Sequence, residues 1–220
     1  MTTDIPLCPL SRCGAGRPRS SEREARLQDL VHTAGQLFIR HGYRNVSLEM
    51  LAREAHVAVR TIYVKFGGKA GLLKAVLHAN RERFFRPQEM EEDARPLKEN
   101  LRDFALHFLD LISRPEAIAM HRMVLADAPT NPELAHAFFE AGPQQTRNML
   151  FRFLSRPDIR CQLRDDLDLA TLPVYLMNCI IGDPYERMLF GLPDMSQAEV
   201  EAALDKRLDL FYHSVLKSNA

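Results

Sequence analysis

Residues 59–73 of this 220-residue chain read VRTIYVKFGGKAGLL, and this stretch decides between two very different folds. Basic and polar side chains alternate closely with apolar ones, and Gly67-Gly68-Lys69 follows directly after a phenylalanine. Such a string is typical of a phosphate-binding loop in a nucleotide-binding enzyme. It is also typical of a helix that contacts nucleic acid and is joined tightly to the helix behind it.

The phosphate-loop interpretation fails at two positions. A P-loop needs the pattern G-x-x-x-x-G-K-[ST], because its backbone N–H groups wrap the phosphates and its hydroxyl holds a magnesium ion. With Gly68 and Lys69 as the G-K pair, Tyr63 stands where the first glycine is required and Ala70 where the hydroxyl is required. No strand pattern precedes the stretch, so the sequence disfavours a nucleotide-binding enzyme.

The residues just upstream fit a helix-turn-helix motif, which we place at about residues 47–66. This motif needs a small residue where its helices cross, a turn residue that accepts positive φ, and an apolar anchor on the second helix. Ala52, His56 and Ile62 stand at these places, at separations of four and six residues. Histidine enters the left-handed region more readily than β-branched residues do. Ser47 is a suitable N-cap for the first of the two helices.

The second helix of this motif would carry the contacts to DNA. A recognition helix lies in the major groove, where its N-terminal residues meet base edges and flanking groups hold phosphates. Arg60 is the expected guanine contact because its guanidinium matches the O6 and N7 acceptors; a solvated surface charge is an equal alternative. Lys69 opens the next helix, where free N–H groups and the helix dipole favour a phosphate. The side chains available on the recognition helix are Val59, Arg60, Thr61, Tyr63, Val64 and Lys65.

The whole chain has a helical pattern, and we predict an all-α protein. No proline occurs from residue 19 to residue 86, which suits a compact helical unit. Pro143, Pro173 and Pro184 are expected to kink or interrupt the later helices. Those helices are predicted at residues 97–112, 115–127, 132–155, 168–190 and 196–217. The resulting parts are a disordered basic arm at 1–20, a compact unit at 21–86 and a larger helical part at 87–220.

Charge is distributed unevenly along the chain. The formal net charge is zero, but residues 1–86 carry a net charge of +8 and residues 87–220 carry −8. A basic N-terminal third indicates contact with a polyanion, and the acidic remainder indicates a different task.

Targeting signals and metal-binding patterns are not found in the sequence. The longest apolar run, residues 172–181, has about half the length of a membrane-spanning helix. The N-terminus lacks the apolar region of a secretory signal, so we expect a cytoplasmic protein without membrane contact. The four cysteines have no CxxC spacing, and we expect no metal and no cofactor.

Residues 24–79 as a whole resemble the DNA-binding domain of TetR-type bacterial transcriptional regulators, the TetR/AcrR family. The resemblance depends on F-x-x-x-G-Y at the end of the first helix, on SLEMLAREA, and on T-I-Y-x-x-F-x-x-K-x-x-L-L. The family's turn usually reads A-G-V-S, whereas residues 55–58 read AHVA here. Residues 121–143 resemble, more loosely, the C-terminal domain of the AefR-like subset.

The resemblance implies that the recognition helix and its surroundings hold double-stranded DNA. For Tyr63, a phosphate contact competes with a role as a half-buried core aromatic. Arg17 and Arg19 resemble arginines of arms that reach into a minor groove, and a plain disordered tail is the alternative. The expected DNA contacts are Ser47, Val59, Arg60, Thr61, Tyr63, Lys65 and Lys69, together with Arg17 and Arg19.

The resemblance further implies that residues 87–220 bind a small hydrophobic effector and form a homodimer. For most candidates ordinary packing is the alternative, since Met and Phe at helical spacing usually belong to the core. The effector candidates are Phe104, Phe108, His121, Met123, Phe138, Phe139, Met149, Tyr175 and Met177. The dimer candidates are Met177, Ile181, Tyr185, Met188, Leu204, Leu208 and Phe211, for which packing within one protomer is the alternative.

These patterns predict a sequence-specific DNA-binding regulator. We expect a ligand-responsive repressor that binds an inverted-repeat operator as a dimer and is released by its effector. An activator or dual regulator of the same family, and a sequence-indifferent architectural DNA-binding protein, are the alternatives. An enzyme is not expected, because the sequence has no Ser/His/Asp or Cys/His arrangement and no paired-carboxylate motif. No catalytic residue is therefore predicted.

Overall fold

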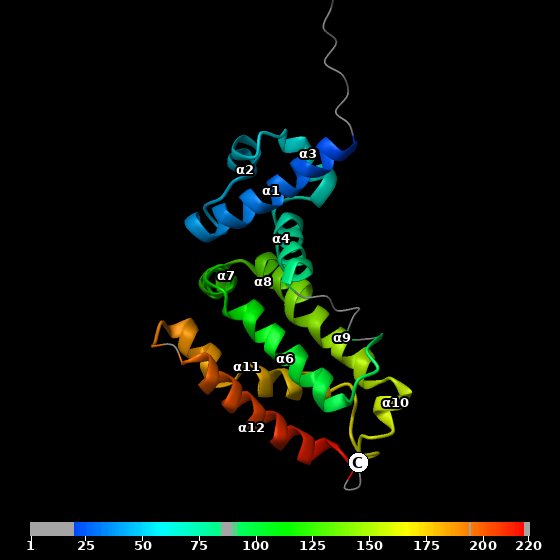
Figure 1. The fold of residues 1–220 in the computed structure, drawn as a ribbon. Helices are drawn as coiled ribbons and strands as arrows, with labels where there is room; N and C mark the ends of the chain where they lie inside the picture. Colours follow the sequence, from blue (N-terminus) through cyan, green and yellow to red (C-terminus); the bar gives the residue numbers. More distant parts are fainter. Residues whose placement is uncertain (1–19, 85–89, 91, 194, 218–220) are drawn as a thin grey trace, which may run out of the picture.

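The computed structural model describes residues 20–84, 90, 92–193 and 195–217, which fold into helices joined by short connections (Figure 1). This confirms the predicted all-α class; in the described part of the chain, the strand-like pairing is limited to an isolated bridge between Leu163 and Leu216. The predicted arm, with Arg17 and Arg19, lies outside the described residues.

The N-terminal helices follow the predicted order. They are α1 (Ser20–His41), α2 (Leu48–Glu54), α3 (Val59–Phe66) and α4 (Lys69–Phe84). Gly42 ends α1 with a φ of 77°, and Gly67 ends α3 with a φ of 75°. Both positions need the left-handed backbone that glycine adopts without strain.

The remaining helices also match the predicted pattern, apart from two differences in extent and one short helix at Pro157–Arg160 that was not predicted. They are α6 (Leu97–Ser113), α7 (Pro115–Asp127), α8 (Pro132–Phe139), α9 (Gln145–Leu154), α10 (Pro157–Arg160), α11 (Leu172–Phe190) and α12 (Gln197–Val215). The helix expected over 132–155 is divided by a π-helical turn at Glu140–Gln144, which contains Pro143. The helix expected from residue 168 begins at Leu172, with Pro173 in its first turn, where no N–H donor is needed.

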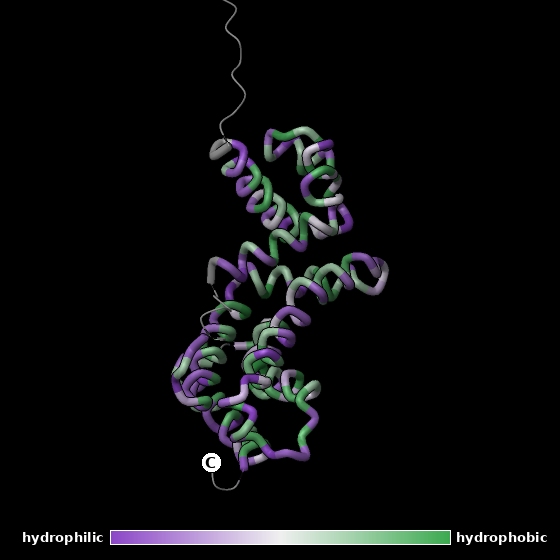
Figure 2. Tube along the Cα trace, turned by 90° about the vertical axis from the view of Figure 1, so that its right-hand side faces the viewer, coloured by the Kyte–Doolittle hydropathy of each residue, from purple (hydrophilic) through white to green (hydrophobic). Residues whose placement is uncertain are grey.

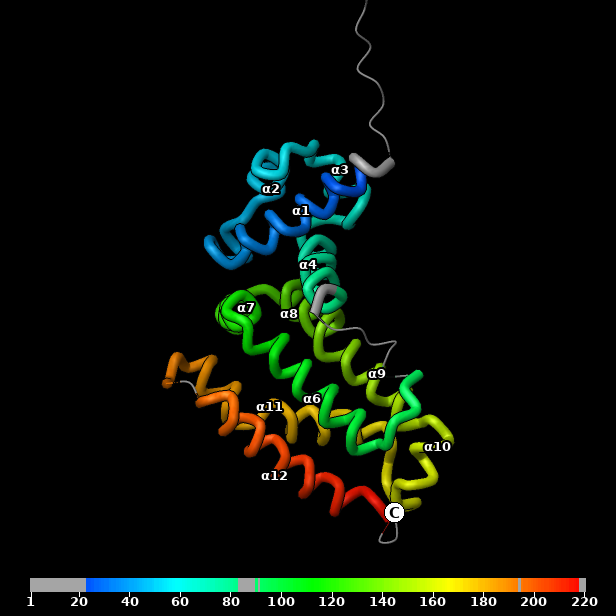
Figure 3. Tube along the Cα trace, in the orientation of Figure 1, coloured from blue at the N-terminus to red at the C-terminus, as the bar shows by residue number. Residues whose placement is uncertain are grey.

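Two hydrophobic cores divide the molecule, and their boundary does not coincide with residue 86. One core joins α1–α4 with α7 and α8, through buried residues such as Phe38, Met123 and Leu134. The other joins α6, α9, α11 and α12. Figure 3 shows α7 and α8 between the upper and lower groups of helices. The predicted DNA-binding unit therefore shares its core with two helices of the C-terminal part.

The helices are amphipathic, as Figure 2 shows by the alternation of hydrophobic and hydrophilic residues along the trace. None of the helices in the described ranges is both long and apolar enough to cross a membrane. Their apolar faces supply the two cores instead.

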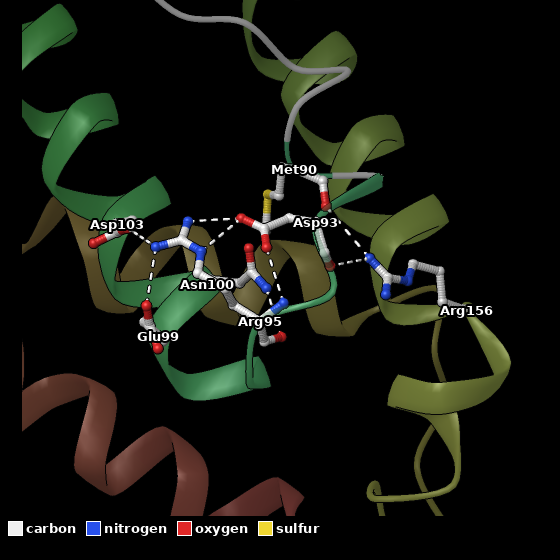
Figure 4. A network of polar contacts seen from close by, with 7 residues as sticks. All are labelled: Met90, Asp93, Arg95, Glu99, Asn100, Asp103 and Arg156. Atoms are coloured by element: carbon white, nitrogen blue, oxygen red, sulfur yellow. Dashed lines mark hydrogen bonds and ion pairs between the residues drawn. The ribbon is translucent and has the colours of Figure 1, made fainter.

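A polar network fastens the segment that enters α6 (Figure 4). The Arg95 guanidinium contacts the carboxylates of Asp93, Glu99 and Asp103. Arg156, which follows α9, donates to the Asp93 carbonyl oxygen at 2.7 Å. The network is largely exposed, so it fixes the direction of the chain more than it adds stability.

His56 forms the turn between α2 and α3 with a φ of 52°, as the motif requires. A left-handed backbone costs a non-glycine residue about 1 kcal/mol. We expect His56→Gly to raise the free energy of unfolding by up to about 1 kcal/mol in urea denaturation, because glycine adopts this backbone without strain. The greater conformational entropy of glycine in the unfolded chain offsets part of this gain. Arg53→Gly, at an exposed position inside α2, is the control and should lower it by about 1 kcal/mol. A loss of stability equal to that of the control would contradict strain at His56.

Candidate nucleic-acid interface

The outer face of α3 is the centre of the candidate interface. Ile62 is fully buried and anchors the helix, whereas Tyr63 is 57% exposed and Val64 is 69% exposed. Arg60 and Lys65 are exposed beside them, and Val59 and Thr61 are half-buried. The exposure of Tyr63 excludes its role as a core aromatic in the free protein.

The first turn of α3 has no side chain that caps it. Ala58 is the N-cap residue and supplies no acceptor, although the Thr61 N–H bonds to the Ala58 carbonyl oxygen at 2.8 Å. The partial positive charge of this helix end is therefore not neutralised by a cap and suits an anion.

Ser47 caps α2 as predicted. Its Oγ accepts a hydrogen bond from the Met50 N–H at 3.1 Å, and the residue is exposed. Ala52 is buried where α2 crosses α3, and the Val57 N–H closes the turn on the Ala52 carbonyl oxygen at 2.9 Å. These contacts fix the angle between the two helices of the motif.

A hollow of about 500 Å³ between α1 and α3 extends the interface. Arg23 and Arg26 line it from α1, and Arg60 and Lys65 line it from α3. No carboxylate from the described residues lines it. Arg23 and Arg26 were not among the predicted contacts, although two exposed arginines three residues apart at the start of a helix are a signal for a basic surface.

Lys69 lies partly inside the protein, not on the surface that faces outward from α3. Its Nζ donates to the carbonyl oxygens of Tyr43 (2.8 Å) and Val46 (2.9 Å) and lies 4.4 Å from the centre of the Tyr43 ring. Burial lowers the pKa of this ammonium, while Glu133 and Asp127 act in the opposite direction. Two of its three donors hold the turn before α2, which argues against the predicted phosphate contact.

The predicted effector residues are distributed over two cores and the surface. Phe104, Met149 and Met177 belong to the lower core, with Phe108 packed against it, and Met123 and Phe138 belong to the upper one. Phe139 and Tyr175 are exposed. These nine side chains are therefore divided between two cores and the surface, and their contact with an effector stays a prediction.

His121 has a specific place at the junction of the two cores. Its Nδ1 is hydrogen-bonded to the Tyr185 hydroxyl, and its ring centre lies 5.5 Å from that of Phe138. Burial lowers the pKa of His121 and raises that of Tyr185 to about 12. This pair links α7 to the second half of α11.

The predicted dimer residues also lie mostly inside one protomer. Five of the seven side chains are buried within one protomer, which argues against their direct contact with a partner. Ile181 and Met188 remain partly exposed. The large apolar side chains exposed on the two helices are instead Tyr175 (61% exposed) and the terminal Phe190 (80%) on α11 and Leu210 (70%) on α12. The five buried residues are Met177, Tyr185, Leu204, Leu208 and Phe211.

Both halves of the chain match known protein families. Residues 30–76 match the family described as bacterial regulatory proteins, tetR family. Residues 99–214, more than half of the chain, match the AefR-like transcriptional repressor, C-terminal domain.

Individual proteins of known sequence and structure are also similar. The chain is 27% identical over 186 residues to the HTH-type transcriptional repressor ComR of Escherichia coli (strain K12), covering 82% of this chain and 85% of that protein. The flavonoid-responsive regulator FrrA has a similar fold, with a TM-score of 0.68 and 23% identity over 89% of this chain and 99% of FrrA. So does NalD of Pseudomonas aeruginosa, the secondary repressor of the MexAB-OprM multidrug efflux pump. Its TM-score is 0.61 at 19% identity, over 89% of this chain and 98% of NalD.

Proposed function

Because this chain belongs to the TetR family of bacterial transcriptional regulators, with an AefR-like C-terminal domain, we propose that it is a cytoplasmic repressor that binds an inverted-repeat operator as a homodimer. A small, largely apolar effector releases it from the operator. The observation that supports the proposal best is the exposed outer face of α3 beside a hollow lined by four basic side chains. A flavonoid-responsive regulator and a repressor of a multidrug efflux pump among the similar structures support an apolar effector.

In the proposed complex α3 lies in the major groove. Arg60 reads a guanine, while Lys65, Thr61 and Val59 face base edges or nearby phosphates. Tyr63 and Ser47 contact the backbone, together with Arg23 and Arg26 of α1. Arg17 and Arg19 would add contacts in the minor groove.

The proposal is tested by selecting bound fragments from random DNA with the full chain. We expect an inverted repeat whose half-sites are about one helical turn or a multiple apart. Enrichment of no consensus would favour the architectural alternative. Transcription from the selected site, measured with and without the protein, then separates a repressor from an activator.

Arg60 and Arg26 should behave differently, and each variant is the control for the other. Arg60→Ala is expected to relax the preference at one base pair of each half-site, because a base contact is lost. Arg26→Ala is expected to weaken binding to all DNA sequences alike and to reduce the slope of log affinity against log salt by about one unit. An unchanged selected sequence for Arg60→Ala, or an unchanged salt slope for Arg26→Ala, would contradict the respective role.

The dimer is proposed to form through the outer faces of α11 and α12. The two helices contact each other and expose Tyr175 and Leu210. Leu210→Glu is expected to give monomers in sedimentation velocity and at least about 100-fold weaker operator binding, because two linked half-site contacts become one. Leu125→Glu, the same change at a residue of α7 that is 56% exposed, should leave the dimer intact. A dimer that persists in Leu210→Glu would contradict this interface.

A further inference from the structure

A groove of about 1040 Å³ lies between the DNA-binding helices and the corner where α6 meets α7. α1, the end of α3 and α4 line it from one side, and residues 111–120 line it from the other. Its volume is at the upper end of the range of small-molecule sites. None of the predicted effector residues lines it.

The groove offers an apolar surface to a ligand. α1 contributes a stripe of apolar residues, and α4 and the α6–α7 corner contribute more. Burying an apolar body there removes its surface from water, which is the main favourable term in such binding. The main apolar lining residues are Leu27, Val31, Ile39, Val76, Leu111 and Met120.

Three carboxylates line the same groove, one from each of three helices. They are Glu24 of α1, Glu82 of α4 and Glu116 of α7, and all three are exposed. In the described part of the chain, Glu24 and Glu116 form no ion pair, and Glu82 meets only His78, at 3.5 Å.

The cationic side chains of the groove do not balance these acids. Arg114 is already paired with Asp110, which is 2.6 Å away, and Lys65 is the other cation that lines the groove. The lining therefore keeps a negative excess, which is complementary to a positively charged ligand.

The groove and the DNA interface share part of a wall. Leu27 and Lys65 line both the groove and the basic hollow between α1 and α3. An occupant of the groove thus contacts residues that border the proposed DNA surface, and it also contacts the α6–α7 corner.

We propose that this groove is an effector site for an amphipathic organic cation. The apolar part of the ligand lies over α1, and its charged group lies among the three carboxylates. The inference rests on the proposed function and names the class of its effector. Because the ligand contacts both the DNA-binding helices and the α6–α7 corner, it holds them at one fixed spacing. Its positive charge also lies in the groove that is bordered by Lys65, a proposed DNA contact. Through these two effects it lowers operator affinity.

Binding is tested by isothermal titration of the full chain with decyltrimethylammonium below its micelle concentration, and with decanoate as an anion of similar chain length. We expect saturable binding of the cation and weaker binding of the anion. Glu82→Gln combined with Glu116→Gln should weaken cation binding at least about fivefold. Asp29→Asn, an exposed acid of α1 outside the groove, is the matched control and should bind normally.

A second variant tests the location independently of charge. Ala79→Trp places a large ring in the groove from an exposed position of α4, and it is expected to reduce cation binding at least about tenfold. Because the chain has no other tryptophan, fluorescence of this residue also reports that the variant is folded. Equal binding of decanoate, or wild-type affinity in both groove variants, would overturn the site.

Operator affinity measured by fluorescence anisotropy, with and without the cation, tests the regulatory part. A fall in affinity that disappears in Ala79→Trp supports it. Cation binding at the groove with unchanged operator affinity would overturn the proposed regulatory effect, although the binding site itself would stand. A chain that selects no DNA sequence would overturn the proposed function, and the titrations would still decide whether the groove binds the cation.

Discussion

Lys69→Met is expected to lower the free energy of unfolding by about 2 kcal/mol and to weaken binding to every DNA sequence at least about tenfold. The ammonium holds the carbonyl oxygens of Tyr43 and Val46, at 2.8 and 2.9 Å. Methionine keeps the length of the stem but offers no donor, so both acceptors lose the ammonium, and the Tyr43 carbonyl oxygen keeps only the longer bond from the Val46 N–H, at 3.4 Å. The cost is placed at the low end of the range for unsatisfied groups because Lys69 is only partly buried.

DNA binding should fall because of where the two carbonyl groups lie. Tyr43 and Val46 belong to the turn that joins α1 to α2, and Ser47 caps α2 directly after it. When the turn loosens, the helix-turn-helix motif moves relative to α1 and its Arg23 and Arg26. The surface is then no longer pre-organised, and every sequence is affected alike.

Urea unfolding and the salt dependence of DNA binding together separate this role from a phosphate contact. A phosphate ligand would leave stability unchanged and would reduce the salt slope by about one unit. Lys74→Met is the control, because Lys74 lies on the same helix in a largely exposed ion pair with Glu140. We expect it to change stability by less than about 1 kcal/mol.

The role of Lys69 shows what a sequence pattern can predict and what it cannot. The spacing of Ala52, His56 and Ile62 predicts the helix-turn-helix motif, because that motif is local and each position has one physical requirement. A lysine that opens a helix after two glycines also looks like a local phosphate site. Its actual partners, Tyr43 and Val46, lie more than 20 residues earlier in the chain, and only tertiary packing brings them to it.

The interface residues show a second limit. A stripe such as Leu204, Leu208 and Phe211 has the same composition whether it faces the core or a partner, since both environments exclude water. Burial within one protomer, 0% exposure for Leu204 and 2% for Leu208, assigns it to the core. The large apolar residues left outside are Tyr175 and Phe190 on α11 and Leu210 on α12. They do not form a stripe and give no periodic signal.

The kink in α11 could be expected from Pro184, but the group that stabilises it could not. Gly182 has a φ of 52° and a ψ of −169°, and proline lacks the N–H that would bond to the carbonyl oxygen of Ile180. Arg207 of α12 supplies the missing donors, with Nε on the Cys179 carbonyl oxygen and Nη2 on that of Ile180 at 3.2 Å. Burial lowers the pKa of Arg207.

Gly182→Ala is therefore expected to lower the free energy of unfolding by about 3 kcal/mol. The backbone region occupied by Gly182 costs a residue with a side chain about 1–3 kcal/mol. The new Cβ would also lie 2.8 Å from Cζ of Arg207, which must move and leave the two carbonyl groups without a donor. The backbone strain and the displacement of Arg207 both destabilise the fold, so relieving one by repacking leaves the other in place.

The effect should extend from stability to assembly, because the kink lies in α11 and its donor in α12, the two helices proposed to form the dimer. Urea denaturation and sedimentation equilibrium of Gly182→Ala measure the two consequences together. Gly142→Ala is the control: its Cβ would meet nothing within 4 Å, and its backbone does not require glycine. Equal stability of the two variants would contradict the prediction. It would mean that Arg207 can move away from the kink without a loss of stability, with water as the donor to the carbonyl oxygens of Cys179 and Ile180. A dimer as tight as wild type in a destabilised Gly182→Ala would place the partner elsewhere than on α11 and α12.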